Sequence, residues 1–146
     1  MERKVVVAGW GQITQPKDTD KTALDPMGLM TQAAKKAAEM MTSKDALKTL
    51  DGIMIVRTVS HHYTSPAQQL AHHIGAKPKL EYVSGIGGNS PQTLVNTAAG
   101  MIARNEIDTV LIAGAEAYVQ REPNTQRIDS ALFRGIPDDY PGDDLI

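Results

Sequence analysis

The chain of 146 residues contains no cysteine, so it can form neither a disulfide nor a thiolate metal site, and it offers no thiolate nucleophile. It also lacks an excess of positive charge. Its 15 Lys and Arg residues are balanced by 17 Asp and Glu residues, which argues against a nucleic-acid partner. No apolar run approaches the roughly 18 residues of a membrane span. The short run after Met1 is unlike a signal peptide, so we expect a soluble cytoplasmic protein.

Four apolar runs are typical of buried strands, and three segments with helical periodicity lie between them. The predicted strands span Lys4–Trp10, Gly52–Val59, Leu80–Ser84 and Asp108–Ala113. The predicted helices span about Pro26–Met41, Pro66–Ile74 and Pro91–Arg104. Most of the strands are nearly continuous Val, Ile, Leu and Met, which favours a mostly parallel sheet covered on both faces. The order predicts an α/β fold of the form β-α-β-α-β-α-β.

Each predicted helix begins with a capping residue followed by proline, in the pairs Asp25-Pro26, Ser65-Pro66 and Ser90-Pro91. The side chain of the first residue can accept a free N–H, and proline has none to leave unbonded. Ser65 and Gln68 also match a capping box. Gly75 predicts a left-handed end to the second helix.

The third predicted helix is apolar around most of its circumference and has almost no charge before Arg104. Such a helix is expected to be buried on several sides, in the middle layer of a three-layer architecture. The region after it behaves differently, because residues 117–146 show no sustained periodicity. A structureless stretch of that length is uncommon in a compact domain. We therefore predict an α/β domain over residues 1–116, followed by an irregular region that is incomplete without a C-terminal half.

The most informative stretch is the glycine-rich turn Ser84–Gln92, which leaves a predicted strand and opens a predicted helix. Backbone N–H groups at such a junction can surround an anion at the positive end of the helix. The turn nevertheless holds no cysteine, histidine or acid. Two interpretations stay open: an acyl-CoA or oxyanion pocket, or a tight turn whose glycines need positive φ. The first makes substrate-binding residues of Gly87, Gly88, Asn89 and Ser90.

Other functional roles are less well supported by the sequence. Ser90 is expected to cap a helix rather than to act as a nucleophile, because Pro91 follows it. A dinucleotide-binding fingerprint is incomplete, since the third glycine is missing and the motif follows the third strand. The pairs His61-His62 and His72-His73 lack an acid or cysteine to complete a ligand set, so no metal site is expected. Asp51 is expected to be a solvated or turn residue.

Three stretches together resemble one family. They are Val5-Val6-Val7-Ala8-Gly9-Trp10-Gly11, Gly87-Gly88-Asn89-Ser90-Pro91-Gln92, and Ala98 to Ala117, with Asp108-Thr109-Val110-Leu111-Ile112-Ala113-Gly114 and Glu116. Their order along the chain and their amino-acid sequences resemble the N-terminal part of thiolases. The similarity is closest to bacterial thiolase-like acetyl-CoA acetyltransferases of the sterol-carrier-protein thiolase branch, and it covers about residues 4–120.

The resemblance implies a thiolase-like layered fold and an acyl-CoA acyltransferase, with a coenzyme A thioester as substrate and no bound cofactor. Thiolases place a nucleophilic cysteine at the start of the third helix, where the helix end lowers the pKa of the thiol. Gly88 occupies that position here, so we expect no catalytic residue in this chain and no activity of the chain alone.

The resemblance also implies partners. It predicts a homodimer in which the strand Leu80–Ser84 pairs across a two-fold axis, or a partner that supplies the C-terminal half. Two other functions stay open. The chain could be a non-catalytic binding or assembly subunit of a thiolase-like complex, or, less favoured, a small nucleotide-binding α/β domain.

Overall fold

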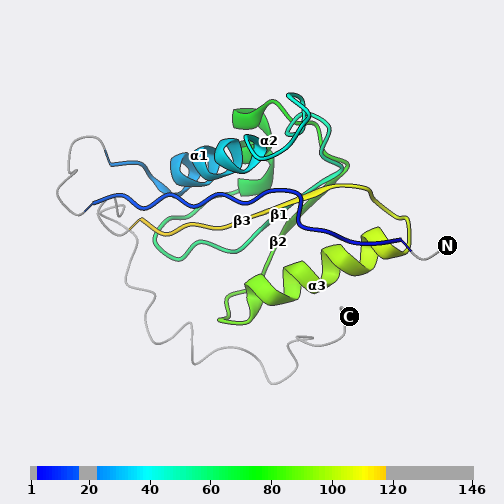
Figure 1. The fold of residues 1–146 in the computed structure, drawn as a ribbon. Coiled ribbons are helices and arrows are strands. Elements are labelled where there is room, and N and C mark those ends of the chain that lie inside the picture. The colour runs from blue at the N-terminus through cyan, green and yellow to red at the C-terminus, as the bar shows by residue number, and fades with distance from the viewer. Residues whose placement is uncertain (1–2, 17–22, 118–146) are drawn as a thin grey trace, which may run out of the picture.

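The computed structural model describes residues 3–16 and 23–117, in which helices and strands alternate along the chain (Figure 1). The elements are α1 (Pro26–Ala38), β1 (Gly52–Ile55), α2 (Pro66–Ile74), β2 (Leu80–Val83), α3 (Ser90–Ala103) and β3 (Val110–Ala113). The predicted α/β class is confirmed, as are the three helices and the last three strands, although most elements are shorter than predicted. The predicted irregular region lies outside the described residues, apart from Ala117.

The three strands form a parallel sheet in the order β2-β1-β3. In the ladder, Gly52 lies opposite Leu80 on one side and Val110 on the other. Helices α1 and α2 cover one face of the sheet, and α3 lies against the other (Figure 1). The central strand β1 is buried along its whole length because it has a neighbour on each side and a helix on each face.

Two hydrophobic clusters follow from the alternation of side chains along β1. Ile53 and Ile55 point into a cluster with Met30 of α1 and Leu70 of α2. Met54 points to the opposite face, where it forms a second cluster with Leu94 and Ala98 of α3. Helices therefore pack on both faces of the sheet. This packing fixes the positions of the carboxyl ends of the strands.

The predicted strand Lys4–Trp10 is wrong, because no strand is formed before β1 in the described part of the chain. Residues 3–13 run extended beside β3 instead (Figure 1). Arg3 forms an ion pair with Asp108 just before β3. No backbone hydrogen bond joins this described segment to β3. Its β-branched residues suit a strand, but a strand is defined by a ladder that this segment does not make.

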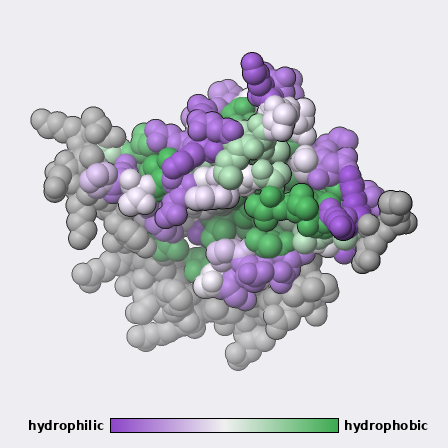
Figure 2. Space-filling view, viewed as in Figure 1, coloured by the Kyte–Doolittle hydropathy of each residue, from purple (hydrophilic) through white to green (hydrophobic). Residues whose placement is uncertain are grey.

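The packing of the N-terminal segment against α1 depends on its glycines. A Cβ at Gly9 would collide with the backbone oxygen of Ala37, and one at Gly11 with that of Ala33. The valines of the same segment lie at the surface: Val6 is 74% and Val7 84% exposed. Figure 2 shows hydrophobic residues gathered where this segment crosses the face of the molecule.

Two of the predicted helix ends are confirmed. The carboxylate of Asp25 accepts a hydrogen bond from the backbone N–H of Gly28 at 2.8 Å and so caps α1. Gly75 ends α2 with φ of 73°, in the left-handed region that favours glycine. Helix α1 stops at Ala38 rather than at Met41, because the chain tightens there into turns of shorter hydrogen-bond spacing.

The two predicted serine caps are wrong. Ser65 precedes α2 but makes no side-chain bond to the helix, so the capping box with Gln68 is not formed. Ser90 is the first residue of α3 rather than its cap, and its hydroxyl bonds back into the turn that precedes the helix. Sequence spacing identified both helix starts, whereas the rotamer of each serine depends on its tertiary surroundings.

The prediction that α3 lies in a middle layer is wrong for the described residues. Only Ser90, Leu94 and Ala98 of this helix are buried. Val95 is 46% exposed, and so is Ile86, at 45%, in the preceding turn. No other described element packs on the outer side of α3 (Figure 1). The outer side of α3 therefore exposes Val95 beside the polar residues Gln92 and Asn96, while Met101 and Ile102 are half-buried.

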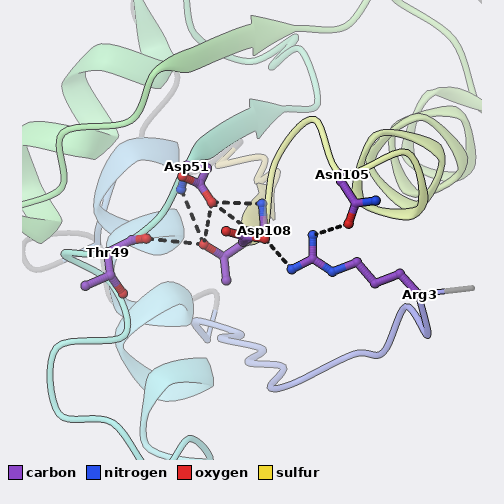
Figure 3. A network of polar contacts seen from close by, with 6 residues as sticks. Arg3, Thr49, Asp51, Asn105 and Asp108 are labelled. Atoms are coloured by element: carbon purple, nitrogen blue, oxygen red, sulfur yellow. Dashed lines mark hydrogen bonds and ion pairs between the residues drawn. The ribbon is translucent and has the colours of Figure 1, made fainter. Parts of the chain in front are cut away.

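Asp51 lies in a bend, as predicted, but its carboxylate also ties together the amino ends of β1 and β3 (Figure 3). It accepts hydrogen bonds from the backbone N–H groups of Asp108 at 2.9 Å and Thr109 at 3.1 Å. The hydroxyl of Thr109 donates to the carbonyl of Thr49 at 3.2 Å. The N–H of Asp108, above all, lowers the pKa of Asp51 from its ordinary value.

Candidate functional site

The glycine turn lies at the carboxyl ends of the parallel strands. Residues 84–90 follow β2, residues 56–60 follow β1, and residues 114–117 follow β3. In open sheets with helices on both faces, ligands bind outside the carboxyl ends of the strands. The stretch predicted from the sequence therefore occupies the edge at which this fold class places its sites.

Two serines fix the ends of the turn. Ser84 and Ser90 are buried, whereas residues 85–89 between them are exposed. The hydroxyls of both serines donate to the carbonyl oxygen of Gly85, at 2.8 Å and 3.0 Å. The backbone N–H of Ser90 donates to the carbonyl of Gly87 at 3.1 Å. The Ser90 hydroxyl is thus engaged in shaping the turn and has no histidine among its contacts.

The glycines of the turn do not need positive φ, so that explanation of the motif is wrong. Among the described glycines, Gly75 alone has positive φ. A Cβ at Gly87 would lie 2.9 Å from Oδ1 of Asn89, at the end of an exposed side chain that can move aside. A Cβ at Gly88 would meet no atom within 4 Å. Gly88 therefore leaves open space at the start of α3, in which a side chain would fit.

The amino end of α3 points into this open space without a side-chain cap. Asn89, which precedes the helix, makes no capping bond, and Pro91 has no N–H. The backbone carbonyl of Asn89 accepts the N–H of Thr93 at 3.0 Å, which is the first regular bond of the helix. The positive end of the helix dipole therefore faces the exposed turn, where it favours negative charge.

A polar clamp joins the glycine turn to the end of β3, and sequence reasoning missed it. The backbone N–H of Arg57 donates to the Ser84 hydroxyl, and its Nε donates to the Ser84 carbonyl, both at 3.1 Å. The carboxylate of Glu116 accepts the N–H of Val59 at 2.6 Å and that of Ser60 at 2.7 Å. The available signal was an acid three residues after a predicted strand. The sequence did not indicate which segment its carboxylate would contact.

The same region contains a buried hydroxyl with no partner. Thr58 lies between Arg57 and Val59 in the chain, and its Oγ1 makes no hydrogen bond within residues 3–16 and 23–117. A buried polar atom without a partner is unfavourable, so this hydroxyl is available to a further group.

A cavity of about 160 Å³ lies near the other end of the clamp. It is lined by Gly11, Gln12, Ile13, Leu29, Ala33, Gly114, Ala115 and Glu116. The predicted substrate-binding residues Gly87, Gly88, Asn89 and Ser90 are not among its walls. The cavity and the glycine turn therefore occupy separate parts of the carboxyl edge, on the sides of β3 and β2.

The ring of His61 lies 3.3 Å from the hydroxyl of Ser60, in the segment after β1. His61 is buried and stacks on Tyr63 with 6.1 Å between the ring centres, whereas His72 and His73 lie in the last turn of α2. Within the described ranges, no group of three or more His, Asp or Glu side chains could hold a metal ion. The helices of the described part are all too short or too polar to cross a membrane.

No protein-family model and no curated protein matches the sequence. Solved structures do match. An SCP2-thiolase-like protein type 1 from Mycobacterium smegmatis is 30% identical, with a TM-score of 0.64 over 75% of this chain and 23% of that chain. A Xanthomonas campestris OleA variant with bound lauric acid and lauroyl-CoA is 20% identical, with a TM-score of 0.57 over 78% of this chain and 36% of that chain.

The 3-oxoacyl-[acyl-carrier-protein] synthase III from Aquifex aeolicus is 22% identical, with a TM-score of 0.56 over 66% of this chain and 30% of that chain. The chain thus spans well under half of each of these proteins. The parallel sheet, the helices on both of its faces and the matches together show that the described part of this chain has the fold of the thiolase superfamily.

Proposed function

We propose that this chain is the N-terminal portion of a thiolase-like acyl-CoA acyltransferase that lacks the usual nucleophilic cysteine. Its fold, shared with thiolase-like acyltransferases, and its glycine turn at the carboxyl edge of the sheet support this proposal. One matching protein, OleA, holds lauroyl-CoA in its structure. We assign the same class of ligand, a coenzyme A thioester, to the glycine turn of this chain.

Gly88 is the observation that carries the proposal. It is exposed at the amino end of α3, and the space around it is open. The dipole of α3 and the N–H groups of the turn would stabilise negative charge on a thioester carbonyl oxygen placed there. The chain has no cysteine, so no covalent acyl intermediate forms on a thiolate at this position. We therefore propose that the turn binds the acyl thioester without attacking it.

An acyl-transfer assay tests this proposal. The purified chain is incubated with acetyl-CoA and a second acyl-CoA, and released coenzyme A is measured with a thiol reagent. The chain contributes no background because it has no cysteine. We expect saturable binding of acetyl-CoA without release of coenzyme A above the buffer control. Turnover by the chain alone contradicts the absence of a catalytic group, and a lack of binding contradicts the assigned ligand.

The second candidate is a non-catalytic assembly subunit of a thiolase-like complex. Two surfaces of the described part favour it. Strand β2 is an edge of the sheet, where Tyr82 is 39% exposed, and α3 exposes Val95. We propose that β2 pairs with a second copy of the chain, or that a C-terminal-half partner covers α3. In sizing with light scattering, a homodimer gives twice the 15.8 kDa of one chain. A monomer at micromolar concentration overturns the homodimer.

A further inference from the structure

We propose that Glu116 is a positioning residue for the glycine turn. It does not contact the turn directly but fixes it through residues 57–60. The proposal rests on the function proposed above for that turn, but its contacts are independent of any ligand. Glu116 follows β3, whereas the turn follows β2, and β1 lies between them in the sheet. The segment after β1 is the physical connection.

The first part of the connection is a clamp between Glu116 and the segment after β1. One carboxylate oxygen accepts the N–H of Val59 at 2.6 Å, and the other accepts that of Ser60 at 2.7 Å. The N–H of Ala117 donates to the hydroxyl of Ser60 at 3.0 Å, so the chain beside Glu116 closes the clamp. Hydrogen bonds to an ionised carboxylate are short and stronger than neutral ones. These bonds fix residues 59–60 against the end of β3.

The second part joins the same segment to the turn. Arg57 uses its backbone N–H and its Nε to hold the hydroxyl and the carbonyl of Ser84, both at 3.1 Å. The hydroxyls of Ser84 and Ser90 then meet at the carbonyl oxygen of Gly85. Every step from Glu116 to the first residue of α3 is therefore a hydrogen bond or a short piece of backbone.

The opposite edge of the sheet provides a natural control. Asp51 also uses a carboxylate to accept two backbone N–H groups, those of Asp108 and Thr109 (Figure 3). It joins β1 to β3 as Glu116 does, but at the amino ends of the strands and away from the glycine turn. Removing either carboxylate costs the fold a similar pair of bonds. Only the loss of Glu116 should loosen the turn.

Amide hydrogen exchange measured by NMR on the full chain tests the proposal. The amides to follow are those of Arg57 and Ser90, because their acceptors lie in the turn. In Glu116→Ala we expect exchange at both amides to rise about tenfold or more, as in a local opening. In Asp51→Ala we expect the exchange rates of these two amides to rise no more than those of the most protected amides of β1.

Further variants test whether the loss of Glu116 affects Ser90 through Arg57. Glu116→Gln keeps the length and one carbonyl oxygen, so we expect it to restore part of the protection, and it serves as the primary variant if Glu116→Ala does not fold. Arg57→Ala removes the bond from Nε to the Ser84 carbonyl but keeps the bond from its backbone N–H to the Ser84 hydroxyl. In an Arg57→Ala background, Glu116→Ala should therefore raise exchange at Ser90 by less than it does in the unaltered chain, because residues on one path are not additive.

Two outcomes overturn the proposal: faster exchange confined to Val59 and Ser60, or an equal rise at Ser90 in the Glu116 and Asp51 variants. Neither measurement uses acyl-CoA, so a failure here is distinct from a failure of the proposed function.

Discussion

At the scale of single residues, the buried hydroxyl of Thr58 gives a direct test of the carboxyl edge. Its Oγ1 has no hydrogen-bond partner in the described ranges. Thr58→Val keeps the shape and removes the polar atom, so we expect the free energy of unfolding to rise by about 1 kcal/mol. Denaturant unfolding at equilibrium measures this change. A loss of stability would show that the hydroxyl has a partner after all, and weaker acetyl-CoA binding would identify that partner as the ligand.

Gly88 allows a second test at the residue scale, because a cysteine placed there is the only one in the chain. We expect Gly88→Cys to fold, since a Cβ meets no atom within 4 Å. The amino end of α3 should lower the pKa of the new thiol below its ordinary value of about 8.5. The pH dependence of iodoacetamide alkylation measures that pKa. Ala103→Cys, at the carboxyl end of the same helix, is the matched control and should show no lowering.

The same variant extends the functional proposal. We expect isolated Gly88→Cys to remain inactive in thiolysis, because a thiolate alone lacks the acid–base groups that acyl transfer requires. The described turn offers no such group: residues 85–89 carry no histidine or acid. Thiolysis by the isolated variant would contradict this expectation and would show that the remaining machinery is present in this chain.

At the scale of elements, Asp51 links stability to pH through the amino ends of β1 and β3. Its pKa in the folded chain is lowered from the usual 3.8, first by the N–H of Asp108. A lowered pKa means that the ionised carboxylate stabilises the fold above about pH 4 and that this contribution disappears as the pH falls through the folded value. We expect Asp51→Asn to lose about 1 kcal/mol at pH 7.

The difference in free energy of unfolding between Asp51→Asn and the unaltered chain should therefore shrink below about pH 4. Urea unfolding at a series of pH values measures it. Asp45→Asn is the control, because Asp45 pairs with Lys48 on the exposed surface and such pairs contribute little. A difference that persists unchanged at low pH would show that folding does not lower the pKa of Asp51.

Helix α3 supplies a matched pair of neighbours for a further prediction. Leu94 is 1% exposed and packs on Met54, whereas Val95, the next residue, is 46% exposed. We expect Leu94→Ala to lower the free energy of unfolding by about 2–4 kcal/mol. Val95→Asp should change it by less than about 0.5 kcal/mol while weakening any association through this face. A large loss of stability in Val95→Asp would place Val95 in the core of the isolated chain.

Local signals explain why the elements could be predicted. Proline after a small polar residue identified all three helix starts, and Gly75 identified the end of α2. The prediction failed where a structure depends on residues distant in sequence. The run Val5–Val7 has the composition of a strand, but it makes no ladder with β3. The glycine turn could be predicted from its sequence because its residues are consecutive. The clamp could not, because Glu116 is separated from Val59 by 57 positions and from Ser60 by 56.

At the scale of the whole molecule, the described part is a sheet with helices on both faces that leaves apolar residues and an edge strand exposed. Val6 and Val7 are exposed, β2 is an open edge of the sheet, and α3 exposes Val95. Monomeric soluble proteins rarely leave such surfaces uncovered together. This arrangement agrees with a chain that spans 23% to 36% of the three matching proteins described above and that we propose to function with a partner.

The central claim is that the glycine turn is an acyl-CoA contact without a nucleophile. Titration of the ¹⁵N-labelled chain with acetyl-CoA, followed by amide chemical shifts, tests it most directly. We predict saturable shifts concentrated at residues 85–93, with no release of coenzyme A during the titration. Shifts centred elsewhere, such as on the cavity between Gly11 and Glu116, or no saturable shifts at all, would contradict the claim.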